Sequence, residues 1–431
     1  MSRLLLLALI LSSAANAATF TVDTTDNGNL SACTAAAADC SYNGAVTRAN
    51  NAAGADDIAF AIPLSDPGCT AGTGVCRIQF ATSPVPISDL LTIDGYTQPG
   101  ASANTLNPDQ GGSNAQIKIE LRGCPSCGSG IAIAENAPAS TVRGLAIGGF
   151  TGGAGFATSF FVGGSGRVIE GNFIGTDASG TVAVPNARGI SASGNASAGS
   201  QPQNMRIGGA LPAQRNLISG NIGNGIDSNG TALQVLGNLI GTTANGLAAL
   251  PNQQIGVFIA GCGGSSGASA RIGGLDVGER NVISGNGSHG VQIGNPNGGC
   301  ANTVGALIRG NYVGAAVNGT GVIGNGLQDP FSRANVLLRT GGGAGAPNVV
   351  GGREAGAGNL ILGGVGPGVG FPGDAFAAAF GNRMRDNRKL GLDGGSSGVR
   401  ELNDAGDGDN FFGGGSTGRN QNFPVISAYS V

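Results

Sequence analysis

Residues 206–221 have the sequence RIGGALPAQRNLISGN, and residues 271–286 have the closely related sequence RIGGLDVGERNVISGN. A second string, GNFIGT at 171–176, recurs as GNLIGT at 237–242 and in altered form as GNYVG at 310–314. The apolar runs inside these repeats are rich in β-branched residues, bounded by Gly and Asn, and too short for helices. Repetition of this kind predicts a solenoid in which each repeat stacks on its neighbours.

The repeat length bears on the number of coils. Ile207 and Ile272 occupy the same place in successive copies and are 65 residues apart, and the echo at Val350 lies 78 residues further on. This distance is too long for one coil, so we expect it to contain three coils of roughly 20 to 25 residues each. The whole repeat region would then form on the order of 15 coils.

The composition supports a solenoid over a compact globule. Gly accounts for 83 of 431 residues, only 11% are charged, 5% are aromatic, and Trp is absent. There is no G-X-Y period, which excludes collagen, and the regularly placed Ile, Val and Leu argue against disorder. Asn next to Gly tolerates the left-handed conformation of sharp corners, and stacked coils would align such Asn side chains in hydrogen-bonded ladders. We therefore predict an all-β fold, a single-stranded right-handed parallel β-helix.

Both ends of such a solenoid need covering, because an open coil exposes strand edges and core residues. The segment 42–50 places Ala45, Val46 and Ala49 on one helical face and predicts a short N-terminal capping helix, followed by a strand at 58–62. From about Arg383 the repeats stop and charges become frequent. The expected organisation is a signal peptide at 1–17, an N-terminal cap at 18–56, the β-helix at 57–382, and an acidic polar C-terminal cap with a final strand at 383–431.

The N-terminus has the features of an export signal. Arg3 precedes an apolar run at 4–11 and the typical cleavage site Ala15-Asn16-Ala17. The run is too short to span a bilayer, and we find no other apolar stretch of spanning length. We expect a protein that is secreted by the general secretory route, is extracellular or at the cell surface, starts at Ala18 and has no membrane span.

Eight cysteines fall in near pairs after the signal. An even number in an oxidising compartment predicts four disulfides. The sequence does not determine their connectivity, and pairing of near neighbours is expected: Cys33 with Cys40, Cys69 with Cys76, Cys124 with Cys127, and Cys262 with Cys300. A redox role for the C-x-x-C of Cys124 and Cys127 is the alternative, but no thioredoxin-like pattern surrounds it.

The charge distribution limits the partners. The formal net charge is −3, the only lysines are Lys118 and Lys389, and no basic tract occurs. A nucleic-acid or anionic-membrane partner would require a positive surface. We expect a monomer whose partners are an extracellular polysaccharide or a surface protein.

Several segments resemble a known family. They are CSYNGAV at 40–46, TIDGYTQPG at 92–100, LGLD at 390–393, NFPV at 422–425, and the repeated strings. They resemble secreted bacterial proteins with the CSLREA motif, with which Cys40, Ser41 and Ala45 agree. The resemblance covers nearly all of the chain after the signal. It implies a right-handed parallel β-helix on an extracellular or surface-associated protein, and it implies no established activity.

The strongest metal candidate is an acidic loop near the C-terminus. Asn403, Asp404, Asp407 and Asp409 place oxygen ligands within one Gly-containing turn, which suits Ca²⁺. The loop lacks the closing Glu of an EF-hand, and a solvated Asp-Gly turn is the alternative. No cofactor is otherwise expected.

No catalytic constellation emerges from the sequence. The string 285–290 matches G-x-G-x-x-G, but in a Gly-rich chain it indicates only a turn. His289 lies in the same string, lacks a nucleophile motif around it, and is expected to be a solvated turn residue. Acidic and basic residues gather only near the C-terminus, where we expect a polar cap: Asp386, Asp393 and Glu401 with Arg383, Arg385 and Arg388.

These observations favour a structural, adhesive or glycan-interacting role, because solenoids bind through long side faces. The alternative is a polysaccharide lyase or glycoside hydrolase acting on an extracellular polysaccharide. That alternative rests on analogy with other proteins of this fold.

Overall fold

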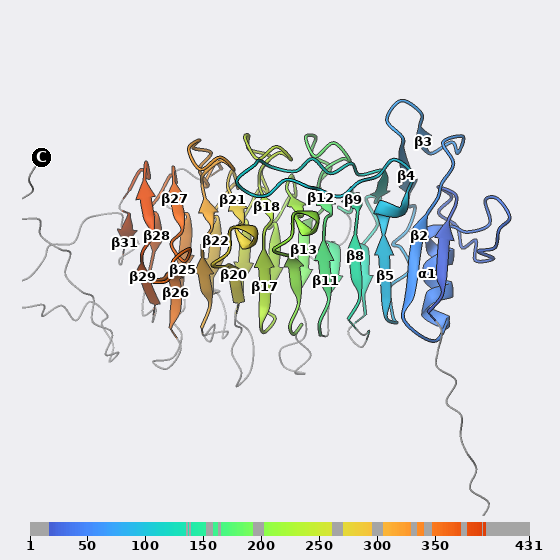
Figure 1. Ribbon diagram of the computed structural model, residues 1–431, viewed down its shortest axis with the longest axis horizontal. Helices are drawn as coiled ribbons and strands as arrows, with labels where there is room; N and C mark the ends of the chain where they lie inside the picture. Colours follow the sequence, from blue (N-terminus) through green and yellow to red (C-terminus); the bar gives the residue numbers. More distant parts are fainter. Residues whose placement is uncertain are drawn as a thin grey trace, which may run out of the picture.

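Short strands separated by glycine corners stack into three long sheets in the computed structural model (Figure 1). The structure describes residues 17–134, 137, 139–151, 158–162, 165–192, 202–260, 270–294, 305–328, 334–339, 347–371, 377–389 and 391–393. In each coil the chain passes from sheet I to sheet II to sheet III, and successive strands within a sheet are parallel. The predicted right-handed parallel β-helix is confirmed.

Sheet I contains eleven strands. They are β1 (Thr19–Val22), β2 (Asp56–Phe60), β5 (Leu91–Asp94), β8 (Thr141–Arg143), β11 (Val168–Glu170), β14 (Arg206–Gly208), β17 (Leu233–Leu236), β20 (Ala270–Gly273), β23 (Leu307–Arg309), β26 (Asn348–Gly351) and β29 (Ala377–Phe380).

Sheet II also contains eleven strands, and only its terminal pair, β3 and β4, is antiparallel. They are β3 (Cys69–Thr70), β4 (Val75–Gln79), β6 (Ile119–Arg122), β9 (Leu145–Gly148), β12 (Phe173–Ile174), β15 (Leu217–Ile218), β18 (Leu239–Ile240), β21 (Val282–Ile283), β24 (Tyr312–Val313), β27 (Leu360–Leu362) and β30 (Arg383–Arg385).

Sheet III contains nine strands. They are β7 (Ser129–Ile133), β10 (Thr158–Val162), β13 (Arg188–Ala192), β16 (Ile226–Ser228), β19 (Val257–Ile259), β22 (Val291–Ile293), β25 (Val336–Leu338), β28 (Val369–Gly370) and β31 (Leu392–Asp393). The α-helix α1 (Tyr42–Asn51) and the 3-10 helices η1 (Gly95–Thr97), η3 (Pro212–Gln214) and η4 (Val277–Glu279) complete these elements.

The expected three coils per repeat are wrong. Ile169, Ile207, Val235 and Ile272 stack on successive strands of sheet I, so consecutive coils are 38, 28 and 37 residues long. The 65-residue repeat is therefore two coils. The estimate of about 15 coils is also too high, since sheet I has eleven strands. Long corner loops, which add residues without adding a strand, account for the difference.

The two coils of a repeat differ in where the long loop lies. In one coil of each repeat a single glycine turns the chain from sheet I to sheet II, as Gly237 does at φ 69°. A Cβ atom there would lie 2.3 Å from the carbonyl oxygen of Gly209, so only glycine fits. The long loop of this coil is a hairpin between sheets II and III. In the second coil the loop containing η3 or η4 joins sheets I and II instead.

The interior is a continuous apolar stack. Ile207, Val235 and Ile272 of sheet I face Ile218, Ile240 and Ile283 of sheet II, and all are fully buried. Full burial of such a side chain contributes roughly 1.5–3 kcal/mol relative to exposure. The strands are short, so the fold depends on this stacking over the whole length.

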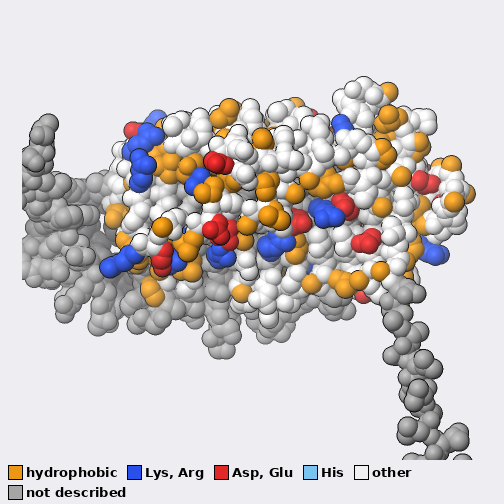
Figure 2. Space-filling view, viewed as in Figure 1, with side chains coloured by type: hydrophobic (Ala, Val, Ile, Leu, Met, Phe, Trp, Pro, Cys, Tyr) orange, Lys and Arg blue, Asp and Glu red, His pale blue; other side chains and the backbone are white. Residues whose placement is uncertain are grey.

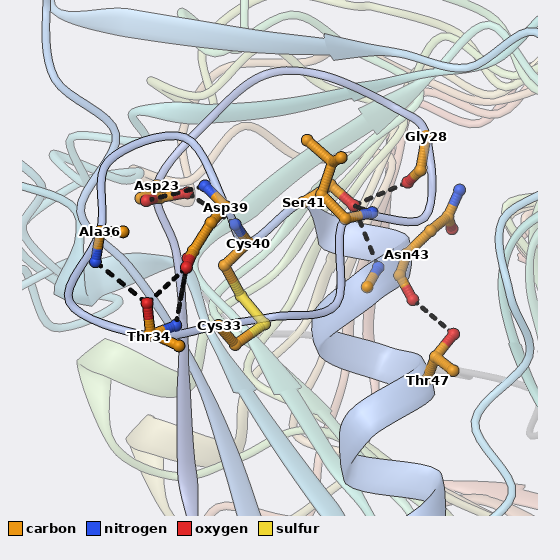
Figure 3. The surroundings of a disulfide bond; sticks show 12 residues. Asp23, Gly28, Cys33, Thr34, Ala36, Asp39, Cys40, Ser41, Asn43 and Thr47 are labelled. Carbon is orange, nitrogen blue, oxygen red and sulfur yellow. Dashed lines mark hydrogen bonds between the residues drawn. A yellow bond between two sulfur atoms is a disulfide. The ribbon is translucent and has the colours of Figure 1, made fainter.

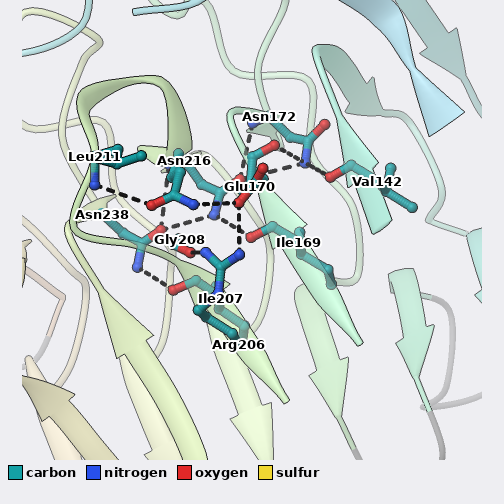
Figure 4. Close-up of polar contacts among 11 residues, drawn as sticks. Val142, Ile169, Glu170, Asn172, Arg206, Ile207, Gly208, Leu211, Asn216 and Asn238 are labelled. Atoms are coloured by element: carbon teal, nitrogen blue, oxygen red, sulfur yellow. Dashed lines mark hydrogen bonds and ion pairs between the residues drawn. The ribbon is translucent and has the colours of Figure 1, made fainter. Parts of the chain in front are cut away.

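Two ladders of asparagines, buried except at their C-terminal ends, confirm the expected alignment of Asn side chains. At the corner between sheets I and II, each Nδ2 donates to Oδ1 of the next Asn at 2.8–3.4 Å; the members are Asn172, Asn216, Asn238, Asn281, Asn311, Asn359 and Asn382 (Figure 4). The corner between sheets II and III carries a second ladder of Asn186, Asn221, Asn252, Asn286, Asn325, Asn335 and Asn387. Each Asn also donates to backbone carbonyls, so the ladders satisfy buried polar groups at the corners.

The N-terminal end is closed by the predicted helix. Ser41 caps α1 by accepting a hydrogen bond from the Gly44 amide at 3.1 Å (Figure 3). The helix buries Ala45, Val46 and Ala49 against the first coil, as expected. Sequence reasoning missed β1, which precedes the helix and pairs with β2. The sheets also continue past residue 382, through β30 and β31.

Three of the expected disulfides form: Cys33–Cys40, Cys69–Cys76 and Cys124–Cys127. The first joins the loop before α1 to the start of the helical cap (Figure 3). The fourth expected pair, Cys262 and Cys300, and residues 1–16 of the signal lie outside the described residues.

Among the helices that the structure describes, none combines the length and the apolar character needed to cross a membrane.

A long loop at residues 98–117, here called the strap, covers the outside of sheet II. In Figure 1 it is the blue-green segment that runs along the upper side of the solenoid. Asn104 donates from Nδ2 to the Pro212 carbonyl at 3.0 Å, and the Ser113 amide donates to the Ala244 carbonyl at 2.7 Å. Arg215 reaches back from the solenoid and donates to the Gly111 carbonyl at 3.1 Å. The strap therefore spans several coils.

Three stacked hairpins, at 176–183, 242–249 and 315–322, complete this cover. They rise side by side in Figure 1, and backbone hydrogen bonds of 2.9 and 3.0 Å join each to the next. Beneath them the outward side chains of sheet II form a second apolar cluster: Ala146, Phe173, Leu217, Leu239 and Val282. The outer face of sheet II is thereby buried from β9 to β21.

Candidate functional site

The outer face of sheet I carries a row of charged side chains along the long axis. In Figure 2 acidic and basic side chains alternate in this row across the middle of the view. They occupy the positions on either side of the inward-facing residue of each strand, since side chains alternate between the two faces of a sheet. Because sheet II is covered, we consider sheet I as the candidate binding face.

The first part of the row lies on β5, β8, β11 and β14. Arg143 Nη2 pairs with Asp94 Oδ2 at 2.7 Å, and Arg143 stands in register with Glu170 on the next strand. Arg206 Nη2 pairs with Glu170 Oε2 at 2.9 Å, and Gln214 donates to the same oxygen at 3.0 Å (Figure 4). The hydrogen bond to Asp94 raises the pKa of Arg143. Two guanidinium groups thus alternate with two carboxylates, and their charges cancel.

The next two repeats rebuild the pair from other residues. Arg271, the counterpart of Arg206, pairs with Glu279 on the loop of η4. The counterpart of Glu170 is Leu236, so the carboxylate has moved from the strand to the corner loop. In the third repeat Arg309 pairs with Glu354 at 3.7 Å. Each repeat therefore keeps one Arg–carboxylate pair at the same edge of sheet I.

These ion pairs are better suited to binding a ligand than to stabilising the fold. The side chains of Arg143 and Arg271 are 44% and 40% exposed, and Glu354 is 54% exposed. Exposed ion pairs of this kind contribute only about 0–1 kcal/mol to folding. They present guanidinium donors next to carboxylate acceptors, which form strong hydrogen bonds with a polar ligand.

A shallow depression of about 240 Å³ interrupts the row at the starts of β17, β20 and β23. Gln234, Arg271 and Leu307 are direct neighbours across these strands, and all three line it. Leu233 and Ala270 lie at its floor, but they are 1% and 3% exposed and belong to the core. The depression therefore combines an apolar floor with an amide and a guanidinium.

Exposed apolar residues border the row on the corner loops. Leu211, next to η3, is 64% exposed, and Leu275 and Val277, around η4, are 44% and 46% exposed. Towards the C-terminal end Phe380 is 39% exposed, and the Arg353 guanidinium lies 5.9 Å from its ring centroid. The edge of sheet I thus alternates apolar and charged groups along the solenoid.

One carboxylate on sheet III stands apart. Asp227 on β16 is 8% exposed, lies 3.5 Å from Arg188 Nε, and accepts a hydrogen bond from Asn224 at 3.3 Å. Burial raises the pKa of Asp227, although Arg188 and Asn224 act in the opposite direction. Sequence reasoning missed this pair, since Arg188 and Asp227 belong to different coils.

The metal ligands predicted near the C-terminus are not among the residues that the structure describes. Asn403, Asp404, Asp407 and Asp409 lie outside the described residues, as does Glu401. Within the described part of the chain, no three His, Cys, Asp or Glu side chains lie together as a metal site would require.

His289 was expected to be solvated, and this is wrong. It is 1% exposed, and its Nδ1 lies 3.0 Å from the Ala334 carbonyl, because the next coil packs over this corner. The string 285–290 is a corner turn that contributes Asn286 to a ladder, as its context predicted. Near the C-terminus Arg385 pairs with Asp386 at 2.5 Å, and both side chains are about half exposed.

No model of a known protein family matches the chain, and a search of curated proteins finds no match. Among solved structures, an alginate lyase from Paenibacillus sp. is 15% identical with a TM-score of 0.31, covering 88% of this chain and 98% of that one. The A-module of the Azotobacter vinelandii mannuronan C-5 epimerase AlgE4 is 14% identical with a TM-score of 0.37, covering 81% and 91%. PfbA, a surface adhesin of Streptococcus pneumoniae, is 12% identical with a TM-score of 0.38, covering 78% and 79%. At these values no ligand can be assigned from the likeness.

Proposed function

We propose that this chain is an exported β-helix protein that binds an extended polysaccharide along the outer face of sheet I. The observation that carries the proposal is the row of partly exposed Arg–carboxylate pairs, which recurs once per two-coil repeat. Two rungs of a parallel sheet span about 10 Å. A linear polymer of repeating units matches such a periodic face better than a compact ligand does.

The remaining features support this role. Sugar hydroxyl groups both donate and accept hydrogen bonds, and each ion pair offers a donor next to an acceptor. The strap and hairpins cover the outside of sheet II from β9 to β21, whereas the outside of sheet I carries the long row of charged side chains. The three disulfides suit an oxidising, extracellular location. The signal at 1–17, membership of the CSLREA-motif group, and calcium at Asn403, Asp404, Asp407 and Asp409 belong to the same proposal.

The test is a binding screen of the protein from Ala18 onward against soluble neutral and acidic polysaccharides, by affinity electrophoresis and calorimetry. We expect binding, and Arg143→Gln should weaken it about tenfold, the loss of about one charged hydrogen bond. Arg77→Gln is the matched control, because Arg77 is 56% exposed and paired with Glu120 on sheet II. Absence of any binding, or equal binding by the two variants, would contradict the proposal.

A polysaccharide lyase or hydrolase is the second candidate, and Asp227 is the observation that favours it. A carboxyl group with a raised pKa is suited to general acid catalysis, and Arg188 lies beside it. The same screen should be read for reducing ends and for unsaturated products. Turnover that Asp227→Asn abolishes would support an enzyme, whereas binding without turnover would leave the binding role.

A further inference from the structure

We propose that the depression at Gln234, Arg271 and Leu307 is a subsite for one uncharged sugar unit, so that the ligand is a neutral polysaccharide. This inference rests on the proposed function and specifies its ligand class. It is carried by the shape and chemistry of the depression and by the charge balance of the face around it.

The dimensions of the depression suit a single sugar ring. Gln234, Arg271 and Leu307 lie on three consecutive strands, so the side chains follow one another at about 4.8 Å. The depression has a volume of about 240 Å³ and is shallow. A ring can therefore lie in it while its neighbours in the polymer continue along the axis in both directions.

The lining divides into an apolar and a polar part. Leu307 offers aliphatic surface to the C–H face of a pyranose ring. The Gln234 amide supplies one donor group and one acceptor for ring hydroxyls. Binding sites for small ligands have this composition, with a mostly apolar lining and a few polar groups that fix orientation.

The charge balance argues against an acidic sugar. The Arg271 guanidinium is already paired with Glu279, whose side chain is 13% exposed. A ligand carboxylate approaching Arg271 would also meet this carboxylate and would lose most of the attraction. Hydroxyl groups have no such conflict, since one can accept from the guanidinium while its neighbour donates to the carboxylate.

The same balance holds along the face. Asp94 and Glu170 compensate Arg143 and Arg206, and the whole chain has a formal net charge of −3. A polyanion requires a positive stripe to overcome repulsion and to attract it over a distance. This face presents alternating signs and no such stripe, which selects for an uncharged polymer.

The test compares hexasaccharides of neutral sugars (glucose, xylose and mannose series) with hexauronates, by titration calorimetry at 20 and 200 mM NaCl. We expect a neutral hexasaccharide to bind with less than a twofold change in affinity between the two salt concentrations. Leu307→Glu should weaken this binding at least tenfold. Leu247→Glu is the matched control, because Leu247 is 54% exposed on the hairpin at 242–249, away from sheet I, and the affinity of this variant should stay within twofold of the wild type.

Gln234→Leu serves as a second variant of the subsite, and thermal melting confirms that each variant folds. If only hexauronates bind, with an affinity that falls steeply with salt, the inference is overturned while the proposed function stands. Equal binding by Leu307→Glu and Leu247→Glu would overturn the location of the subsite. If neither class of saccharide binds, the proposed function itself fails.

Discussion

Asn216 donates a hydrogen bond from Nδ2 to Oδ1 of Asn238 at 2.9 Å, linking two coils through side chains that are 22 residues apart. Asn238 in turn donates to Oδ1 of Asn281 at 3.0 Å and to the Ile207 and Leu236 carbonyls at 2.9 Å. All of these groups are buried. The corner is thus a chain of linked hydrogen bonds. Substitution of Asn238, its central member, measures how much these bonds contribute to stability.

Asn238→Ala should lower the free energy of unfolding by about 2–4 kcal/mol. The substitution removes the Oδ1 that accepts from Asn216 and takes one hydrogen bond from each of the Ile207 and Leu236 carbonyls. The Leu236 carbonyl keeps a bond from the Gly209 amide at 2.9 Å. A lost buried hydrogen bond costs about 0.5–1.5 kcal/mol, and a group left unsatisfied about 1–3 kcal/mol. Urea unfolding measures the change. Asn245→Ala, in an exposed hairpin, is the control and should change stability by less than about 0.5 kcal/mol. Equal effects of the two variants would show that the ladder adds no stability.

Removal of the strap should expose apolar surface. Ser102 and Gln116 are joined by two backbone hydrogen bonds of 2.8 and 3.1 Å, so residues 103–115 can be replaced by Gly-Gly at that bridge. Leu217 and Leu239 of the second apolar cluster would lose part of their cover. We expect a lower melting temperature and binding of the dye ANS, which reports exposed apolar surface.

Arg215→Met in the intact chain shows whether ANS binding by the strap deletion comes from lost cover or from a change in the charged contact beneath the strap. Burial lowers the pKa of Arg215 to about 10, so the buried cation disfavours the folded state and is offset by its bonds to carbonyls of the strap and solenoid. The variant keeps most of the side-chain volume, and it should not bind ANS. ANS binding equal to that of the strap deletion would contradict the covering role of the strap.

Asp66 should make stability depend on pH in the acid range. Partial burial raises its pKa, but hydrogen bonds from Thr25, Gly68 and Thr24 outweigh burial and hold the pKa below the ordinary 3.8. The folded state therefore binds the proton less well than the unfolded state. The stability contributed by Asp66 is fully present above pH 3.8 and is lost as the pH falls through the lower folded pKa.

Asp66→Asn should accordingly melt at most a few degrees below the wild type at pH 6, since the group is only partly buried, and the difference should vanish near pH 2. Calorimetry across this range measures it. Asp109→Asn, on an exposed part of the strap, gives the comparison. A difference that persists unchanged to pH 2 would contradict the assignment to the carboxylate.

The Cys33–Cys40 disulfide should stabilise the N-terminal cap. Its sequence separation of seven predicts a stabilisation of about 2.5 kcal/mol in the chain-entropy model. Replacing both cysteines by alanine should lower the melting temperature and increase amide exchange in α1 before that of the central strands. Uniform exchange over the whole chain would instead indicate that the cap and solenoid unfold together.

Chelation tests the proposed calcium site directly. If Asn403, Asp404, Asp407 and Asp409 bind Ca²⁺, EDTA should lower the melting temperature and added Ca²⁺ should restore it. A variant with all three aspartates changed to asparagine should no longer respond. An unchanged melting temperature together with no calorimetric binding would rule the site out.

Local chemistry explains what could be predicted of the fold. Glycine at positions such as Gly237, asparagine beside it, and short apolar runs specify a corner and a strand wherever they occur. The capping helix at Tyr42–Asn51 and the disulfides of near neighbours are local in the same sense. Repetition of these signals was sufficient to predict the parallel β-helix and its Asn ladders.

The remaining features of the fold and of the candidate site depend on contacts between segments that are far apart in the sequence. The repeat holds two coils because loops of unequal length lie at alternating corners, and periodicity does not show where a loop leaves the stack. The strap selects the exposed face through contacts such as that of Asn104 with Pro212, 108 residues away. The Arg–carboxylate row depends on Arg206 meeting Glu170 on a strand but Arg271 meeting Glu279 on a loop. The sequence by itself therefore determined the architecture, through local backbone preferences, whereas the candidate binding face was decided by tertiary packing, which determines the coils that lie side by side and the surfaces left uncovered.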